Sequence, residues 1–498
     1  MTFKKLVLIT AMASALGALY GCTEGDESSI LIEGDETTNN NGGGGETPGE
    51  VTVSENCPEW ASAKNKDDDG NDVCALPSTI MEDRTLSSDI VWYLEDRVTV
   101  GNGNREMSAT PGELASGAAV ADVTLTIDAG TAIKGKKGTF ANLLITRGSK
   151  IMAEGTADAP IVFSSDDADD TGSGEWGGLI LHGYAPHNEC PTAADSACNI
   201  DAEGESGFAG GYDADDSSGV LKYVVVTEGG YEFAPGDEIN GISLVGVGAG
   251  TEVDYVQVNS NSDDGIEFFG GTVNMKHVVL TNNLDDSVDW DEGFQGNLQY
   301  VLVIQNDPET FGTTVEADTE GTNEFLSKPT IANATFYGVV GGSDPAAMHN
   351  MKAGTGGFFH NSIMLADTDA TTYKACVFVN GSSAQSNQNT SLVYDNVMVS
   401  CGSVGASSFD ATTGDPVTTN FTLNAGGFIE ADPDLTESYV PQAAEASLAA
   451  PIDWTAVLGT YPESTAIPDY LDATDYLGAV DPDATSLWFE GWTIEGSL

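Results

Sequence analysis

The chain has 498 residues, with 78 Asp and Glu against 17 Lys and Arg, and its formal net charge is −61 at pH 7. Such a charge excludes nucleic-acid binding, which needs a basic surface, and disfavours direct binding of polyanions unless metal ions mediate it. The surface repels itself unless salt or divalent cations screen it. We therefore expect a solvated surface suited to a saline medium, a calcium-dependent exported protein, or both.

The N-terminus has the features of an export signal. Lys4 and Lys5 precede the short apolar stretch 6–18, and LYGC (19–22) resembles a bacterial lipobox. We predict a lipoprotein signal over 1–21 and lipidation at Cys22, which would anchor an exported protein in the outer membrane, on its periplasmic or cell-surface face. Plain secretion with a free cysteine is the alternative. The apolar stretch is too short to span a membrane.

Two short segments come before the first repeats. Residues 22–56 are acidic and rich in Gly and Asn, which is typical of a disordered, flexible tether. Residues 57–79 form a segment that a disulfide would close, and its NKDDDGND (65–72) matches the first half of a calcium loop. The candidate calcium ligands there are Asn65, Asp67 and Asp69. Because the distal Glu of such a loop is missing, a solvated acidic turn is the favoured interpretation.

The cysteines other than Cys22 are six in number and fall into three local pairs. An even set in an exported protein indicates disulfides, and no CxxC spacing suggests zinc or redox chemistry. Proximity in the sequence favours the pairs Cys57–Cys74, Cys190–Cys198 and Cys376–Cys401.

Residues 80–430 alternate short β-branched runs with Gly, Asn and Asp turns, as in VTLTIDAGTAIKG (123–135). No long helical period is present, and the strands are too closely spaced for helical crossovers. Parallel strands without helices are best accommodated by a coil that returns to its own start. We therefore predict an all-β solenoid.

Four strands carry the clearest repeat: LKYVVVTEG (221–229), VDYVQVNSN (253–261), MKHVVLTNN (275–283) and LQYVLVIQN (298–306). Their third residues are separated by 32, 22 and 23 positions, the first gap holding an insertion. The alternating valines are predicted to form buried columns, with neighbouring coils about 4.8 Å apart. The third residues point outward as an aromatic column, either for sugar binding or, as we favour, for packing under a loop. These residues are Tyr223, Tyr255, His277 and Tyr300.

Two acidic segments also match at a separation of 22 residues, SDDGIEF (262–268) and LDDSVDW (284–290). Stacked on neighbouring coils, their acids would repel unless they splay into water, bind a cation or stay partly protonated. Calcium accepts about six to eight oxygens and suits such a cluster. For this cluster, ordinary solvated turns at the start of a strand come first, a calcium site second and catalytic carboxylates third. The candidate calcium ligands are Asp263, Asp264, Glu267, Asp285, Asp286 and Asp289.

Residues 431–498 break the repeat, and we expect them to cap the open end of the solenoid, because an exposed strand edge invites aggregation. The histidines are poor candidates for metal ligands as well, because His277 is more typical of a surface residue and His349 and His360 are too isolated. They are scattered along the chain, and we expect none of them to form a metal site.

Several motifs together resemble a group of exported bacterial right-handed parallel β-helix proteins with a pectate-lyase-like superfold. They are LTIDAGTAIKG, KIMAEGTADAPIVFSS, GEWGGLILHGYAPHN, NSDDGIEFFGGTVN and the closing YLGAV. The resemblance covers roughly residues 80–490. It implies a right-handed parallel β-helix and export, but no settled activity. The superfold includes pectate lyases, polygalacturonases, alginate epimerases and non-enzymatic adhesins.

Two functions stay open. The favoured one is calcium-dependent binding at the cell surface, in adhesion, glycan binding or contact with the cell envelope. The alternative is a polysaccharide hydrolase or lyase that uses an aspartate cluster as acid and base, formed by Asp263, Asp264, Asp285 and Asp286. The acidic pair resembles that of polygalacturonases, but their Gly-His-Gly and Arg-Ile-Lys have no counterpart in this sequence. Neither the ligand nor the oligomeric state follows from the sequence.

Overall fold

The computed structural model describes residues 52–167, 172–192, 197–234, 238–306, 312–319, 325–338, 346–366, 373–413, 415–423 and 426–498. The expected signal, Cys22 and most of the tether lie outside these residues. The described residues belong to one compact unit, Val51–Leu498. None of the described helices is long and apolar enough to cross a membrane.

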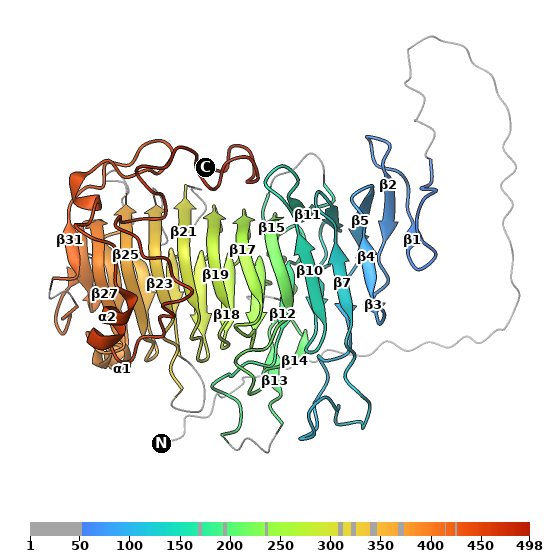
Figure 1. Ribbon diagram of the computed structural model, residues 1–498, viewed down its shortest axis with the longest axis horizontal. Coiled ribbons are helices and arrows are strands. Elements are labelled where there is room, and N and C mark those ends of the chain that lie inside the picture. Colours follow the sequence, from blue (N-terminus) through green and yellow to red (C-terminus); the bar gives the residue numbers. More distant parts are fainter. Residues whose placement is uncertain are drawn as a thin grey trace, which may run out of the picture. The chain divides into compact units, whose positions relative to one another are not determined.

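Most strands belong to two long sheets that run along the axis of a solenoid (Figure 1). We call the 16-stranded one the long sheet. It contains β1 (Ser62–Ala63), β2 (Asp72–Ala75), β4 (Arg84–Leu86), β5 (Ile90–Leu94), β7 (Thr124–Ile127), β8 (Ala132–Gly135), β10 (Lys150–Glu154), β11 (Ile161–Ser165), β15 (Gly219–Thr227), β17 (Glu252–Asn259), β19 (Asn274–Thr281), β21 (Asn297–Gln305), β23 (Thr330–Gly338), β25 (Gly357–Ala366), β27 (Leu392–Ser400) and β31 (Phe428–Glu430).

The 11-stranded sheet, called here the short sheet, faces it across the core. It contains β3 (Thr79–Ile80), β6 (Val98–Val100), β9 (Leu143–Ile145), β12 (Leu179–His182), β16 (Ile242–Val245), β18 (Ile266–Phe269), β20 (Val288–Asp291), β22 (Val315–Ala317), β24 (Ala347–Met351), β26 (Ala375–Val379) and β28 (Ser403–Ala406). The remaining elements are the hairpins β13 (Ile200–Ala202)–β14 (Gly207–Ala209) and β29 (Ser408–Phe409)–β30 (Pro416–Val417), the helices α1 (Gly381–Ser386) and α2 (Trp454–Thr460), and a 3₁₀ turn at Ala444–Ala446.

Within each of the two sheets, neighbouring strands pair in parallel from β2 onward, each with the corresponding strand of the next coil. This arrangement is a right-handed parallel β-helix, so the predicted fold class is confirmed. The parallel pairing already begins at Asp72–Ala75, inside the segment that we expected to precede the solenoid. Each coil of the solenoid thus stacks directly on the next, as the sequence repeat predicts.

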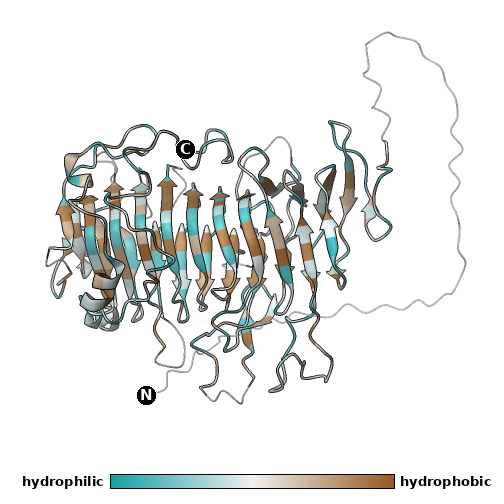
Figure 2. Ribbon diagram, in the orientation of Figure 1, coloured by the Kyte–Doolittle hydropathy of each residue, from teal (hydrophilic) through white to brown (hydrophobic). Residues whose placement is uncertain are grey.

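The predicted buried columns are confirmed. Val224 pairs with Val256, Val256 with Val278, and Val278 with Val301, and all four side chains are fully buried. Each such side chain contributes roughly 1.5–3 kcal/mol by its removal from water. Apolar residues recur along the strands (Figure 2), and their side chains make up the buried core. The core is thus one continuous column of stacked side chains along the axis.

The long sheet bends at one position in successive coils. The residue there has a left-handed backbone, with φ between 49° and 61° in seven consecutive coils. On β15, the residues before this bend pair with β10 and those after it pair with β11. The bend residues are Tyr223, Tyr255, His277, Tyr300, Asn333, Asn361 and Asn396. A non-glycine residue in this conformation costs about 1 kcal/mol or more, which the stacking of like residues offsets.

The predicted position of residues 431–498 at the open end is wrong. After β31 the chain returns along the outer face of the long sheet. Asp472 pairs with Lys276 at 2.8 Å, and Gln257 donates to Ser497 at 2.9 Å. The segment ends near β17 and β19 (Figure 1). The side chains of the long sheet explain this path, because outward amides and rings offer partners along the whole flank.

This returning segment also decides between the two interpretations of the aromatic column. The rings of Tyr223, Tyr255, His277 and Tyr300 stack with centroids 4.4, 4.2 and 4.9 Å apart. Trp492 meets the first two rings edge-on, and Trp488 lies 5.2 Å from His277. The column therefore packs under a covering segment, as favoured from the sequence.

Three disulfides are present: Cys57–Cys74, Cys190–Cys198 and Cys376–Cys401, as predicted. The first joins the N-terminal segment to β2. The second closes the base of an insertion that carries the β13–β14 hairpin. The third connects β26 of the short sheet to the end of β27 of the long sheet.

Candidate functional site

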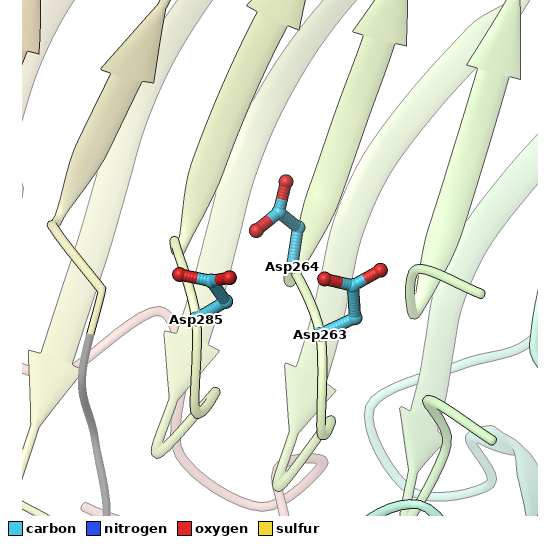
Figure 3. Close-up of side chains that lie close together, drawn as sticks. All are labelled: Asp263, Asp264 and Asp285. Atoms are coloured by element: carbon cyan, nitrogen blue, oxygen red, sulfur yellow. The ribbon is translucent and has the colours of Figure 1, made fainter. Parts of the chain in front are cut away.

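The acidic segments lie side by side on the outer side of the short sheet. Asp263 and Asp264 come directly before β18, and Asp285 occupies the same place in the next coil (Figure 3). Beyond them, Glu267 of β18 pairs in register with Asp289 of β20. We call this set of side chains the acidic ladder. The geometry that the 22-residue spacing predicted is therefore present.

The ladder continues one coil further than the sequence indicated. Asp289 pairs with Glu316 of β22, which we did not predict. Glu316 follows Asp289 by 27 residues and sits in VEA, without the Asp-Asp pair of the earlier coils. More residues separate β22 from β20 than separate β20 from β18, so no fixed repeat length places Glu316. Only its outward position on a strand, between two apolar residues, could have indicated it.

Three groups of carboxylates each have oxygen atoms within 4.8 Å of one another. The groups overlap, because Asp264 belongs to two of them and Asp289 also belongs to two. They are Asp263–Asp264–Asp285, Asp264–Glu267–Asp289 and Asp286–Asp289–Glu316. The acids therefore form a continuous row rather than separate pairs.

The ladder lines a hollow of about 680 Å³. Two insertions between repeats complete the wall of the hollow: the β13–β14 hairpin and the segment before β16. They contribute acidic residues that the repeat did not predict. Phe233 and Gly204 are the other lining residues. The carboxylates around the hollow are Glu203, Glu205, Glu238, Asp263, Asp264, Glu267, Asp285, Asp286, Asp289 and Glu316.

Asparagine side chains hold both ends of the row. At one end the Asn240 amide donates to Glu203 at 2.8 Å and to Glu267 at 2.5 Å. At the other end the Asn350 amide donates to Glu316 at 2.7 Å, and Lys352 forms an ion pair with the same carboxylate. Between them, Oδ1 of Asp289 is buried and has no hydrogen-bond partner among the described residues. The centre of the row thus has the least compensation.

Turn groups fix the two inner aspartates, which are almost fully buried. Asp264 accepts a hydrogen bond from the backbone N–H of Asp286 at 2.9 Å. Asp286 accepts hydrogen bonds from both the backbone and the hydroxyl of Thr313, the latter at 2.7 Å. These contacts orient the carboxylates but do not neutralise them.

Burial and mutual repulsion raise the pKa of every ladder aspartate. Burial, with the charge of Asp285, raises the pKa of Asp263 to about 7. Burial, with the charge of Glu316, raises the pKa of Asp285 to about 6. The pKa values of Asp264, Glu267, Asp286 and Asp289 also lie well above their usual range, chiefly because of burial. The row therefore binds protons readily wherever no other cation compensates it.

The weaker predicted calcium loop does not gather carboxylates in this way. Asp67 accepts hydrogen bonds from the backbone and the side-chain amide of Asn71, at 2.7 and 2.9 Å, and so closes a turn. Asn65 and Asp69 are exposed. Within the described parts of the chain, the groups of three potential ligands contain neither these residues nor a histidine. The solvated-turn interpretation fits this geometry.

The donors around the hollow suit a hard cation. All are carboxylate oxygens, with amide groups beside them, and calcium binds oxygen ligands at about 2.3–2.6 Å. The same row offers paired carboxylates with different pKa values, the arrangement that acid–base hydrolysis of a glycosidic bond uses. The geometry permits both chemistries.

Comparison with known proteins gives a family. A family model described as the pectate-lyase-like β-helix domain matches residues 112–440, which include β7 to β31 and the whole acidic ladder. Neither the curated proteins nor the solved structures include a significant match. The match supports a carbohydrate-related or surface protein. The chain thus belongs to the family of the pectate-lyase-like β-helix domain.

Proposed function

We propose that the acidic ladder is a calcium-dependent binding site for glycans, on an exported protein that a lipid at Cys22 anchors to the outer membrane. The observation that carries this proposal is the row of three overlapping groups of acidic residues. Within each group, the carboxylate oxygens lie within 4.8 Å of one another. The surface partner is a polysaccharide or another component of the cell envelope. The lipid anchor and the location rest on the sequence motif alone.

Electrostatics explain why a cation is needed. Two carboxylates 4.8 Å apart repel by roughly 3.5 kcal/mol at an effective dielectric constant of 20. Several such contacts are comparable with the whole stability of a domain, about 5–15 kcal/mol. Lys352 pairs with Glu316 at the end of the row, and its charge only partly offsets the effect of burial on Asp285 and Asp289. A divalent cation beside Asp289 would neutralise the centre and keep coordination positions for hydroxyl or carboxylate oxygens of a glycan.

A second candidate function is hydrolysis of a polysaccharide. Asp263, with a pKa of about 7, would be protonated about half of the time at neutral pH, and its neighbour Asp285, with a pKa of about 6, would be ionised more often. Such a pair suits an acid and a base on one glycosidic bond. Lyase chemistry is less well served, because the ammonium of Lys352 is already bound to Glu316.

Calorimetry and thermal melts with added calcium, compared with chelator, test the first proposal. We expect heat on calcium addition and a higher midpoint, and both effects should vanish in Asp289→Asn. Asp469→Asn is the matched control, since it removes an exposed carboxylate outside the ladder. An unchanged midpoint together with no heat of binding would refute the calcium site.

Incubation of neutral and acidic polysaccharides with the protein separates binding from hydrolysis. Binding without shortened products supports the first function. Depolymerisation that is lost in Asp263→Asn, but kept in Asp469→Asn, would establish the hydrolase instead.

A further inference from the structure

The acidic ladder is part of a column of outward-facing side chains on the short sheet, and these side chains change from buried to partly exposed along the axis. At the same register position, the preceding coils carry Leu144, Ile180 and Ser243. These three side chains are 0%, 1% and 0% exposed, although they point away from the core. Glu267, Asp289 and Glu316 follow in the next coils and are partly exposed. The column is therefore closed on one side of the ladder and open along it.

Two insertions form the closure. Ile239 packs on Leu144 and Ile180, with Phe140 and Phe233 at the edge of this apolar cluster. Nearer to the ladder, Glu203 of the hairpin accepts hydrogen bonds from Asn240 at 2.8 Å and from Ser243 at 3.3 Å. Since Glu203 and Phe233 also line the hollow, these insertions make an end wall across it.

The end wall is held firmly from several directions. Arg97 donates to the backbone oxygens of Gly204 and Glu205 at the tip of the hairpin, the latter at 2.7 Å. At its base, the buried Arg147 donates to the carbonyl oxygens of Cys198 and Gly210, at 2.8 and 3.0 Å. Multiple buried contacts of this kind favour one fixed position over a swinging lid.

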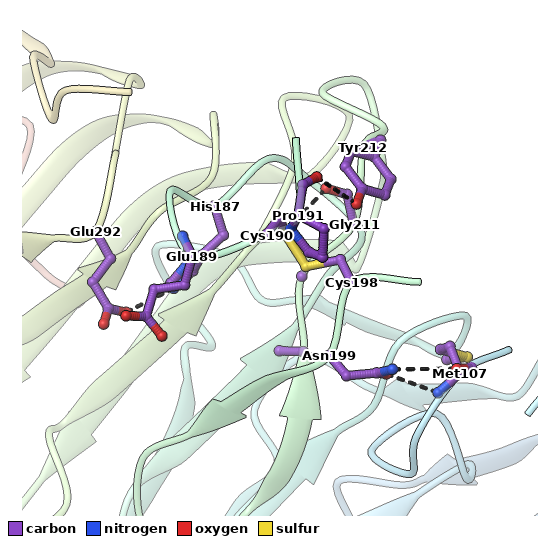
Figure 4. The surroundings of a disulfide bond; sticks show 12 residues. Met107, His187, Glu189, Cys190, Pro191, Cys198, Asn199, Gly211, Tyr212 and Glu292 are labelled. Atoms are coloured by element: carbon purple, nitrogen blue, oxygen red, sulfur yellow. Dashed lines mark hydrogen bonds and ion pairs between the residues drawn. A yellow bond between two sulfur atoms is a disulfide. The ribbon is translucent and has the colours of Figure 1, made fainter. Parts of the chain in front are cut away.

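Covalent and polar links add to this support (Figure 4). The Cys190–Cys198 disulfide closes the chain just before the hairpin. Asn199 exchanges hydrogen bonds with the backbone of Met107, at 2.7 and 3.2 Å. On the other side, Nε2 of His187 lies 2.6 Å from the carboxylate of Glu292, directly after β20 of the ladder. The wall is thus joined both to earlier coils and to the coil that carries Asp289.

A polar atom in the wall supports a bound ligand independently of the acids. Asn240 is 0% exposed, and its amide group faces Glu203 and Glu267. Its Oδ1 is buried and has no hydrogen-bond partner in the described parts of the chain. Buried polar atoms almost always find a partner, and a hydroxyl donor beside Glu267 would supply one. Sugar hydroxyls both donate and accept, which suits an amide next to two carboxylates.

Given the proposed glycan site, on which this inference rests, we propose that the hollow takes the end of a glycan chain or a short oligosaccharide, and not an internal stretch of a long polymer. A polymer lying along the column would meet the wall at Glu203 and Phe233, which line the hollow. The volume of about 680 Å³ also falls within the range of sites for compact ligands, about 300–1,000 Å³. The terminal sugar binds against the wall, and the rest of the chain leaves along the ladder towards Glu316.

Binding stoichiometry tests this inference. The probes are galacturonate and xylose oligomers of increasing length and their parent polymers, titrated in the presence of calcium. We expect one protein bound per chain at every length, and at least tenfold weaker binding once one terminal sugar is chemically capped. A number of bound proteins that grows with chain length would overturn the inference, and so would a lack of binding to every oligomer.

Calcium calorimetry without glycan keeps the two proposals apart. If calcium does not bind, the proposed function fails. If calcium binds but polymers bind internally, only the end-recognition fails.

A variant that loosens the wall sharpens the test. Arg97→Ala removes the contacts to the hairpin tip and should allow several proteins per long polymer, while calcium still binds. Arg97→Lys should restore part of the preference for ends. Arg84→Ala, which removes an arginine paired with Glu82 far from the hairpin in sequence, is the control for loss of positive charge. If folded Arg97→Ala keeps one protein per chain, the hairpin is not the wall.

Discussion

Two columns of like side chains run along the outside of the same coils. One is covered by another part of the chain, and the other lines a hollow. On the long sheet, the rings of Tyr223, Tyr255, His277 and Tyr300 stack face to face. On the short sheet, Glu267, Asp289 and Glu316 stack carboxylate on carboxylate. The returning segment covers the first column, whereas the second column lines a hollow.

The difference follows from the physics of stacking in register. A parallel β-helix repeats each position about every 4.8 Å, so whatever one coil places outside meets its own kind in the next. Aromatic rings attract each other at this spacing, by about 0.5–1.5 kcal/mol per pair beyond the burial of area. Carboxylates repel. The aromatic column is therefore complete within the chain, while the repulsion in the acidic one is only partly compensated by Lys352 near its end.

Removal of the cover from the aromatic column should have the largest effect. Trp492 is 2% exposed and meets two rings of the column edge-on. We expect Trp492→Ala to lower the free energy of unfolding by about 3–5 kcal/mol, the usual range for a buried aromatic residue. Urea denaturation measures it. Calcium binding should not change, because the ladder lies on the other sheet, and a loss of both properties would show that the two columns are coupled.

A neutral residue in the acidic column should act in the opposite direction. In chelator, we expect Asp289→Asn to raise the free energy of unfolding by about 1–3 kcal/mol, because it removes repulsion at the centre of the row. With calcium the order should reverse, since the wild type alone gains from the cation. Paired melts in both conditions measure this, with Asp469→Asn as control. A variant less stable in both conditions would mean that Asp289 serves the fold and not a ligand.

The repeat made much of this comparison predictable from sequence. The 22-residue spacing between Asp264 and Asp286 fixed the register, and the outward parity of Glu267 and Asp289 followed from the alternation of apolar neighbours. Glu203 and Glu238 were not predictable in this way. They come from insertions, whose paths depend on long-range contacts such as those of Arg97 and not on the repeat.

The direction of the C-terminal segment was missed for a related reason. The open end of the solenoid and the outer face of the long sheet both offer groups to which the C-terminal segment can bind. The repeat pattern does not distinguish between them. Gln257 and Gln299 decide it, since their buried amides bind the returning backbone at Ile494 and Asp472. Uncharged amide side chains at outward positions of the long sheet are a signal that could have indicated a covered face.

The pH dependence of stability sharpens the electrostatic contrast. Asp263 and Asp285 have pKa values of about 7 and 6 in the folded chain, against about 3.9 for an unfolded aspartate. Between these values the folded state binds more protons, so stability falls as the pH rises. In chelator we expect a loss of about 2–3 kcal/mol from pH 5.5 to 8.

Calcium should remove most of that loss, because it replaces the protons. Asp263→Asn should flatten the profile even in chelator, whereas Trp492→Ala should shift it down without changing its slope. A wild-type profile that is already flat in chelator would mean that the ladder carboxylates titrate normally.

The smallest effect is expected inside the aromatic column, at its one imidazole. The ring of His277 lies 4.2 Å from that of Tyr255 and 4.9 Å from that of Tyr300, and its Nδ1 is 2.7 Å from Asp254. His277→Tyr keeps the stack and a backbone conformation that three neighbouring tyrosines already adopt. It loses one partly exposed hydrogen bond, so we expect a change within about 1 kcal/mol in urea denaturation. His277→Ala should cost clearly more, because the rings on either side would then stack on nothing. If the tyrosine variant is as unstable as the alanine variant, the contact with Asp254 holds this part of the column, and stacking of like rings is not what closes it.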